Sequence, residues 1–155
     1  MSTVQLNQVV AEFTCATTAE DALTLSSLKG KNVVIYFYPK DNTPGCTQEG
    51  QDFRDLYSEF QAANTDIFGV SRDSIRVHNG FKEKYSFPFD LISDPDESLC
   101  KLFDVIKLKK LYGKEYMGIE RSTFLINADG VLVQEWRKVK VKEHVSEVLA
   151  TVVAL

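Results

Sequence analysis

Residues 33–46 read Val33-Val34-Ile35-Tyr36-Phe37-Tyr38-Pro39-Lys40-Asp41-Asn42-Thr43-Pro44-Gly45-Cys46, and this stretch decides the fold. Its first six residues are β-branched or aromatic, as in a buried strand, and Pro39 lacks the N–H that would continue a strand ladder. Beyond the cysteine, apolar residues recur at i, i+3, i+4 and i+7, on one face of an amphipathic helix: Phe53, Leu56, Tyr57 and Phe60. The stretch therefore predicts a strand, a tight turn and a helix with Cys46 at its start.

Cys46 is the candidate nucleophile because of where this turn delivers it. The unpaired N–H groups and the positive dipole end of a helix's first turn favour an anion, so a cysteine there ionises more readily than an ordinary one. Most cysteines in soluble proteins are packing residues, and the turn sets Cys46 apart from them. The hydroxyl of Thr43, three residues earlier, can hydrogen-bond a thiolate or a substrate oxygen, and Gly45 lets the backbone approach closely.

The same stretch resembles a known family. Residues 39–46 match the peroxiredoxin pattern of a proline, three residues, a threonine, two residues and a cysteine. The run Thr-Pro-Gly-Cys-Thr at 43–47 looks like the peroxiredoxin Q branch, whose members are also called bacterioferritin comigratory proteins. Further segments are similar to that branch, so the resemblance covers most of the chain: 53–55, 69–71, 73–74, 87–89, 91–94 and 116–126.

The resemblance implies a thiol peroxidase that reduces hydrogen peroxide and organic hydroperoxides. Cys46 would attack the terminal peroxide oxygen and become a sulfenic acid, and four residues would form the catalytic site: Cys46, Thr43, Arg121 and Pro39. By composition alone, an arginine at the start of a strand is a solvated or salt-bridged group. In peroxiredoxins the arginine before this kind of strand points to the catalytic cysteine, where its donors stabilise the thiolate and bind peroxide oxygens.

The other two cysteines, Cys15 and Cys100, decide how the sulfenic acid is reduced. Many relatives carry a resolving cysteine five residues after the catalytic one, where this chain has Gln51. Others carry it on the helix after the second strand, where residues 78–85 of this chain contain no sulfur. Cys15 lies in an alternating stretch typical of an N-terminal edge strand, and Cys100 on the apolar stripe of a short helix, so both are expected to be buried packing residues. Two possibilities stay open: a one-cysteine enzyme recycled by thioredoxin, glutaredoxin or glutathione, and a two-cysteine enzyme with Cys100 as resolver.

Other functional classes fit the sequence less well. A general thiol–disulfide oxidoreductase is expected to carry Cys-x-x-Cys, whereas residues 47–49 after Cys46 contain no second cysteine. A holdase that merely uses the fold has no reason to carry the threonine, cysteine and arginine together. His78 and His144 fall in predicted helices among charged residues, without metal-ligand spacing, so we expect no metal site, no cofactor and no cysteine–histidine hydrolase.

Length, charge and cysteine content limit the remaining possibilities. The 155 residues, 44% of them hydrophobic, suit one compact domain spanning 1–155. The net charge of −4 gives no reason to expect nucleic acid or a membrane surface as a partner, and no apolar run approaches the roughly 20 residues of a membrane span. Three cysteines without a recognisable signal peptide indicate the cytoplasm. Members of the branch are often monomeric, so we expect a monomer.

Strand and helix patterns alternate along the rest of the chain. Before the catalytic stretch we expect the edge strand at 10–16, and after it strands near 66–71 and 89–92, helices at 74–85 and 95–104, and a variable loop to about 118. Lysines cluster in this loop and are expected to form a solvated face: Lys107, Lys109, Lys110 and Lys114. Strands 122–126 and 131–136 then flank an Asp-Gly hairpin signal, and an amphipathic helix follows at 145–153. This order predicts an α/β, thioredoxin-like fold with a mixed central sheet flanked by helices.

Overall fold

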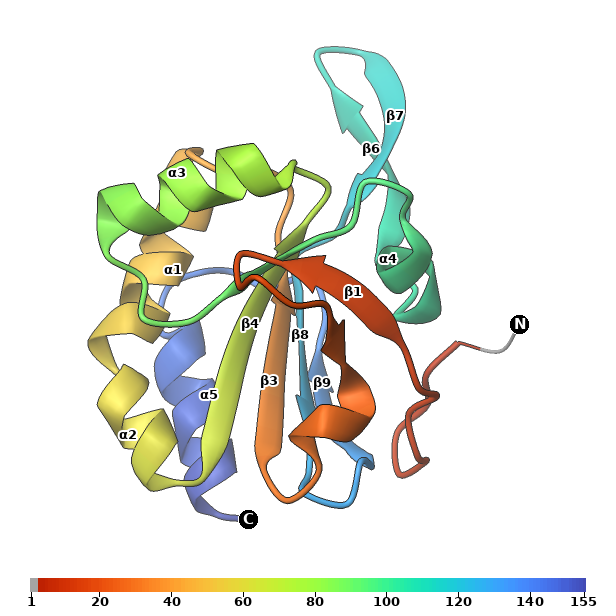
Figure 1. Cartoon of the computed structure of the whole chain (residues 1–155). Helices are drawn as coiled ribbons and strands as arrows, with labels where there is room; N and C mark the ends of the chain where they lie inside the picture. The colour runs from red at the N-terminus through yellow and green to blue at the C-terminus, as the bar shows by residue number, and fades with distance from the viewer. Residues whose placement is uncertain (1–2) are drawn as a thin grey trace.

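The computed structural model describes residues 3–155; residues 1–2, the start of the segment inspected for a signal peptide, lie outside this range. The elements follow the chain in this order: β1 (Thr14–Thr17), β2 (Leu23–Thr24), the short 3-10 helix η1 (Leu25–Leu28), β3 (Asn32–Phe37), α1 (Pro44–Asp55), α2 (Tyr57–Ala62), β4 (Thr65–Ser71), α3 (Ile75–Tyr85), β5 (Leu91–Ser93), α4 (Ser98–Leu102), β6 (Ile106–Leu111), β7 (Lys114–Ile119), β8 (Ser122–Ile126), β9 (Leu132–Trp136) and α5 (His144–Val153). Figure 1 shows how they pack around one central sheet.

The central sheet is mixed, as the sequence predicted. Its seven strands follow the order β2-β1-β5-β4-β3-β8-β9. β4 pairs in parallel with β3 and with β5, whereas the pairs β1–β5, β3–β8 and β8–β9 are antiparallel. Helices cover both faces, so the thioredoxin-like α/β fold class is confirmed.

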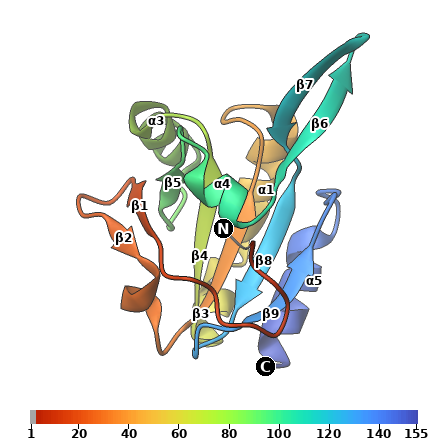
Figure 2. The same ribbon diagram turned by 90° about the vertical axis from the view of Figure 1, so that its right-hand side faces the viewer.

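Strand β3 lies near the middle of the sheet and separates two hydrophobic cores. Alternate side chains of a strand point to opposite faces, so Val33, Ile35 and Phe37 join one core while Val34 and Tyr36 join the other. The first core also takes residues from α4 and the N-terminal segment, and the second takes residues from α1, α2, α3 and α5. Figure 2 shows α4 and the N-terminal segment on one side of the sheet and α1 and α5 on the other.

The segment predicted as a loop before residue 118 is a β-hairpin, so that prediction was wrong. β6 and β7 pair in antiparallel register and extend away from the rest of the molecule (Figure 1). The turn between them is Tyr112-Gly113, with φ of 51° and 77°, and two positive φ values are what a type I′ turn requires. The clustered lysines therefore lie on strands. The signal was missed because Tyr-Gly is not a usual pair for this turn and because lysine is depleted in strands.

Three helix and strand boundaries also differ from the predictions. The helix after Cys46 is interrupted at Leu56, whose φ of −104° and ψ of 8° separate α1 from α2. α4 is shorter than 95–104 because Glu97 has a positive φ of 64° and because Asp94 accepts hydrogen bonds from the N–H groups of the helix's first turn. β1 begins only at Thr14, and it lies between β2 and β5, not at the edge of the sheet.

Within residues 3–155, no helix has both the length and the apolar character needed to cross a membrane.

Candidate active site

Cys46 lies in the first turn of α1, at the end of the sheet where β3 stops. Thr43 is the N-cap residue, with extended backbone angles of −84° and 153°, and Pro44 opens the helix, where a missing N–H leaves no hydrogen bond unmade. The Cys46 side chain is only 2% exposed and packs in the same core as Tyr36 and Tyr38. The predicted strand, turn and helix start are therefore confirmed.

Arg121 directly precedes β8, and its guanidinium reaches the start of α1. Nη2 donates to Sγ of Cys46 at 3.5 Å, and Nη1 donates to Oε1 of Glu49 at 2.6 Å. A permanent positive charge within hydrogen-bonding distance of a sulfur favours the thiolate over the thiol. The structure thus brings together two predicted site residues, Cys46 and Arg121, that are 75 positions apart in the chain.

Gly45 gives the guanidinium its space. A Cβ atom at this position would lie 3.1 Å from Nη2 of Arg121, a distance tighter than most Cβ contacts. The glycine before the cysteine therefore permits the close approach of the Arg121 side chain as well as that of the backbone.

Glu49 is a site residue that sequence reasoning missed. It is fully buried beside Arg121. Its Oε2 atom has no hydrogen-bond partner among residues 3–155. Burial raises the pKa of this carboxyl to about 7, against the opposing effect of the Arg121 charge. The spacing could have indicated this role. Residues three apart share one face of a helix, so Glu49 lies on the same face as Cys46, and an acid on a buried helix face needs a partner.

Thr43 and Pro39 lie in the same turn. The Thr43 hydroxyl donates to the carbonyl oxygen of Lys40 at 2.7 Å. Its single proton is therefore engaged within the turn. To donate to a substrate oxygen, this hydroxyl must first give up its hydrogen bond to Lys40. Pro39 is half-buried and comes immediately after Tyr38, whose N–H makes the last ladder bond of this strand region, to the carbonyl of Val70.

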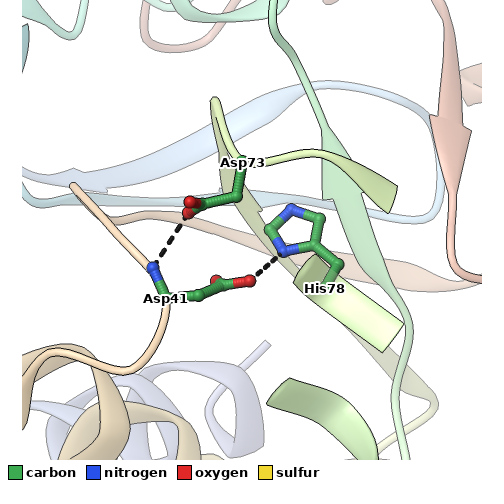
Figure 3. Close-up of side chains that lie close together, drawn as sticks. All are labelled: Asp41, Asp73 and His78. Atoms are coloured by element: carbon green, nitrogen blue, oxygen red, sulfur yellow. Dashed lines mark hydrogen bonds and ion pairs between the residues drawn. The ribbon is translucent and has the colours of Figure 1, made fainter. Parts of the chain in front are cut away.

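A buried polar cluster adjoins the turn. Figure 3 shows the Asp41 carboxylate next to His78, at 2.6 Å from Nδ1, and the Asp41 N–H donating to Asp73 at 2.9 Å. One ligand atom from each of these three residues lies within 4.8 Å of the others, so the group could in principle hold a cation. Each of these atoms is already hydrogen-bonded to the protein, and a metal would have to displace those bonds.

Both histidines lie on helices, as expected, but they are buried and hydrogen-bonded, which their charged sequence neighbours did not indicate. His78 is fully buried on α3. His144 opens α5, and its Nε2 lies 2.8 Å from Oγ1 of Thr123. Burial lowers the pKa of His144 to about 4.

The two remaining cysteines lie away from this site. Cys100 is fully buried in the core on the other face of β3, and Cys15, which is half-buried, packs against that same core. Burial raises the pKa of Cys15 to about 12, and burial together with the neighbouring Asp94 raises the pKa of Cys100 as well. Cys100 is buried as predicted, whereas Cys15 packs against the core but is only half-buried.

Comparison with known proteins identifies the family. A model described as the AhpC/TSA family matches residues 6–135. A protein named peroxiredoxin Bcp, from Bacillus subtilis, is 52% identical over 149 residues, which cover 96% of this chain and 95% of that protein. The chain is a peroxiredoxin of the AhpC/TSA family. Peroxiredoxins are thiol peroxidases, so this chain is an enzyme of that class.

Solved peroxiredoxin structures share the fold closely. Xanthomonas campestris peroxiredoxin Q superposes with a TM-score of 0.88 at 52% identity, over 92% of this chain and 90% of that one. A bacterioferritin comigratory protein from the same organism, described with trapped intermediate and ligand complexes for its alkyl peroxide reduction activity, gives a TM-score of 0.87 at 51% identity with the same coverage. These relatives confirm the resemblance of this peroxiredoxin to the peroxiredoxin Q, or Bcp, branch.

Proposed function

We propose that this peroxiredoxin reduces hydrogen peroxide and organic hydroperoxides through a sulfenic acid at Cys46, with Thr43, Arg121 and Pro39 completing the site. The proposal is carried by the 3.5 Å contact between the Arg121 guanidinium and the Cys46 sulfur at a helix N-terminus. The alkyl peroxide reduction described for the X. campestris relative supports the organic substrates.

The first step makes one bond and breaks another. The thiolate sulfur attacks the terminal peroxide oxygen, the S–O bond forms as the O–O bond breaks, and the hydroxyl stays on sulfur. The leaving oxygen takes up a proton and departs as water or an alcohol. Charge grows on that oxygen in the transition state, and fixed donors aimed at it lower the barrier. Arg121 and the N–H of Cys46 are the donors at this position, and the Thr43 hydroxyl joins them when its proton turns from the Lys40 carbonyl to the peroxide. Pro39 ends the strand so that the turn can begin.

The recycling step follows a one-cysteine scheme. Cys46 and Cys100 belong to cores on opposite faces of β3, while a disulfide needs Cα atoms roughly 4.4–6.8 Å apart. Burial and Asp94 also raise the pKa of Cys100, so it is protonated and a poor nucleophile. An external thiol therefore attacks the sulfenic sulfur and releases water, and a second thiol frees Cys46 from the resulting mixed disulfide.

The reductant, compartment and assembly belong to the same proposal. Thioredoxin, glutaredoxin and glutathione are the candidate thiols, and all three fit an enzyme of the reducing cytoplasm. The enzyme acts as a monomer of one domain spanning residues 1–155, without a cofactor, a metal or a nucleic-acid partner. The net charge of −4 is consistent with this set of partners.

One experiment tests the scheme directly: intact-mass measurement and peptide mapping after one equivalent of peroxide. We expect the protein to gain one oxygen atom at Cys46, Cys100 to remain open to alkylation after unfolding, and further peroxide to drive Cys46 to the sulfinic acid. Cys46→Ser should abolish peroxidase turnover, whereas the matched control Cys100→Ser should retain it with every reductant. Loss of two hydrogens and recovery of a Cys46–Cys100 peptide would establish the two-cysteine alternative instead. A thiol at Cys46 that does not react with peroxide would point to a general thiol–disulfide oxidoreductase or a holdase.

A further inference from the structure

The turn that leads to Cys46, residues 39–43, is anchored by a buried acid. Asp41 is 3% exposed, and its Oδ1 accepts a hydrogen bond from the Tyr38 hydroxyl at 2.6 Å. Its Oδ2 lies 2.6 Å from Nδ1 of His78, whose side chain is fully buried (Figure 3). The Asp41 N–H donates to Asp73, so both the main chain and the side chain of this residue are held.

Asp41 and His78 form a hydrogen-bonded pair, and the bonds of His78 fix how many protons this pair carries. Its Nε2 lies 2.8 Å from the carbonyl oxygen of Ile92, and a carbonyl can only accept, so Nε2 carries a hydrogen. Nδ1 then either donates to the Asp41 carboxylate or accepts from the Asp41 carboxylic acid. In both forms one proton is shared between Nδ1 and Oδ2 and the pair has no net charge, which suits two side chains with no access to water.

This pair joins the turn to three separate elements. His78 connects Asp41 to α3 and, through Ile92, to β5. Asp73 connects Asp41 to the end of β4, because its carboxylate accepts hydrogen bonds both from the Asp41 N–H and from the hydroxyl of Ser71. Within the turn Asn42 adopts a positive φ of 65°, a conformation that asparagine takes more readily than most residues, and the bonds of Asp41 hold the main chain directly before it.

We propose that His78 is a positioning residue of the peroxidase reaction, acting through Asp41. By holding Asp41 it fixes the turn, and with it the position of the Thr43 hydroxyl and the direction of the Cys46 N–H relative to a peroxide. His78 touches neither the substrate nor the sulfur in this role. The inference rests on the proposed peroxidase function of Cys46. A displacement of about 1 Å at a reacting group can slow a reaction by as much as 100-fold, so a small movement of the turn has a measurable effect.

Two isosteric substitutions separate the two hydrogen bonds of His78. An asparagine amide nitrogen takes the place of Nδ1 and can still donate to Asp41, whereas a glutamine amide nitrogen takes the place of Nε2 and can reach only the carbonyl of Ile92. His78→Gln should therefore release the turn, and His78→Asn should hold it. The matched control is His144→Gln, because His144 is also buried at the start of a helix but bonds to Thr123, outside the turn.

The test compares two reactions of Cys46 by stopped-flow: oxidation by hydrogen peroxide, which needs aligned donors, and alkylation by iodoacetamide, which needs the thiolate and access to it but no aligned donors. We expect His78→Gln to slow oxidation roughly 10- to 100-fold while alkylation stays within about twofold of wild type. His78→Asn and His144→Gln should oxidise at close to the wild-type rate. Equal oxidation rates in His78→Gln and wild type, or equal slowing of both reactions, would overturn the proposal.

A second pair of variants decides the matter if the His78 variants do not fold. Asp41→Asn can accept from Tyr38 and donate to a neutral His78, so it should oxidise much faster than Asp41→Ala. Similar rates in these two variants would contradict a positioning role. The wild-type protein keeps the two proposals apart: if its Cys46 is not oxidised at all, the peroxidase function itself fails, whereas normal wild-type oxidation with an unaffected His78→Gln removes only this inference.

Discussion

Arg121 donates a 2.6 Å hydrogen bond to the buried carboxylate of Glu49 with one arm of its guanidinium, and its other arm lies 3.5 Å from the sulfur of Cys46. A guanidinium is planar and rigid, so fixing one N–H fixes the direction of the others. Glu49 thereby aims Arg121 at the sulfur.

The first prediction concerns the shape of the cation at position 121. Arg121→Lys keeps the charge but replaces a planar fork of donors by a single flexible ammonium group. We expect oxidation of Cys46 by hydrogen peroxide to slow roughly 10- to 100-fold, by analogy with the loss of one fixed donor in other active sites. Alkylation at neutral pH should slow less, because the lysine charge still favours the thiolate. If both reactions keep their wild-type rates, Arg121 is only a surface group.

The second prediction concerns stability and pH. Burial raises the pKa of Glu49 from 4.5 to about 7, so the folded protein holds this proton more tightly than the unfolded chain does. The bound proton of Glu49 therefore stabilises the folded protein by about 3 kcal/mol below pH 4.5. This stabilisation is lost as the pH rises through 7. Glu49→Gln cannot ionise. Relative to wild type, its free energy of unfolding should rise between about pH 5 and about pH 8 in urea titrations.

The pH dependence of the wild-type protein alone does not isolate Glu49, because His144 also changes its contribution to stability in this pH range. The free energies of unfolding of Glu49→Gln and wild type are therefore compared as a difference at each pH. Burial lowers the pKa of His144 to about 4, so its contribution has the opposite sign: it is full above pH 6.5 and is lost as the pH falls through 4. The two effects overlap in pH and partly cancel in wild type alone. His144 is present in both proteins and drops out of the difference. A difference that does not change with pH would mean that Glu49 does not titrate in this range.

The third prediction concerns Gly45. A methyl group at this position would lie 3.1 Å from Nη2 of Arg121 and push the guanidinium by a few tenths of an ångström. Gly45→Ala should therefore slow peroxide oxidation by about tenfold with little change in melting temperature. Gly80→Ala is the control, since a Cβ there meets no atom within 4 Å. Unchanged oxidation in Gly45→Ala would show that Arg121 tolerates the displacement.

The fourth prediction contrasts two helical glycines. Gly80 lies in the middle of α3 with open space around it, so Gly80→Ala should stabilise the protein by about 0.5–1 kcal/mol through the helix propensity of alanine. Gly50 lies in α1 against the ring of Phe87, and a Cβ there would collide with that ring. Gly50→Ala should destabilise by about 1–3 kcal/mol despite the same gain in propensity. Urea titrations measure both, and two changes of the same sign would contradict the contrast.

Local patterns predicted most of the secondary structure. β3, α3, the β8–β9 pair and α5 lie where the alternation, the helical periodicity and the Asp-Gly signal placed them, because the geometry of the backbone sets these periods. The β6–β7 hairpin was missed because its turn uses Tyr112 at a positive φ, a conformation that this residue type does not indicate. The interruption at Leu56 was also missed, since Phe53 and Phe60 stay on the buried face on either side of it.

The sequence by itself determined that Cys46 ends a strand and turn and begins a helix, because those features depend on neighbouring residues. Only the tertiary structure decided what surrounds the thiol. Glu49 and Arg121 are 72 positions apart, Asp41 and His78 are 37 apart, and Cys46 and Cys100 lie on opposite faces of one strand. Such relationships depend on strand order and register across the whole sheet, and a pattern that repeats every two or every 3.6 residues carries no information about which distant segment becomes the neighbour.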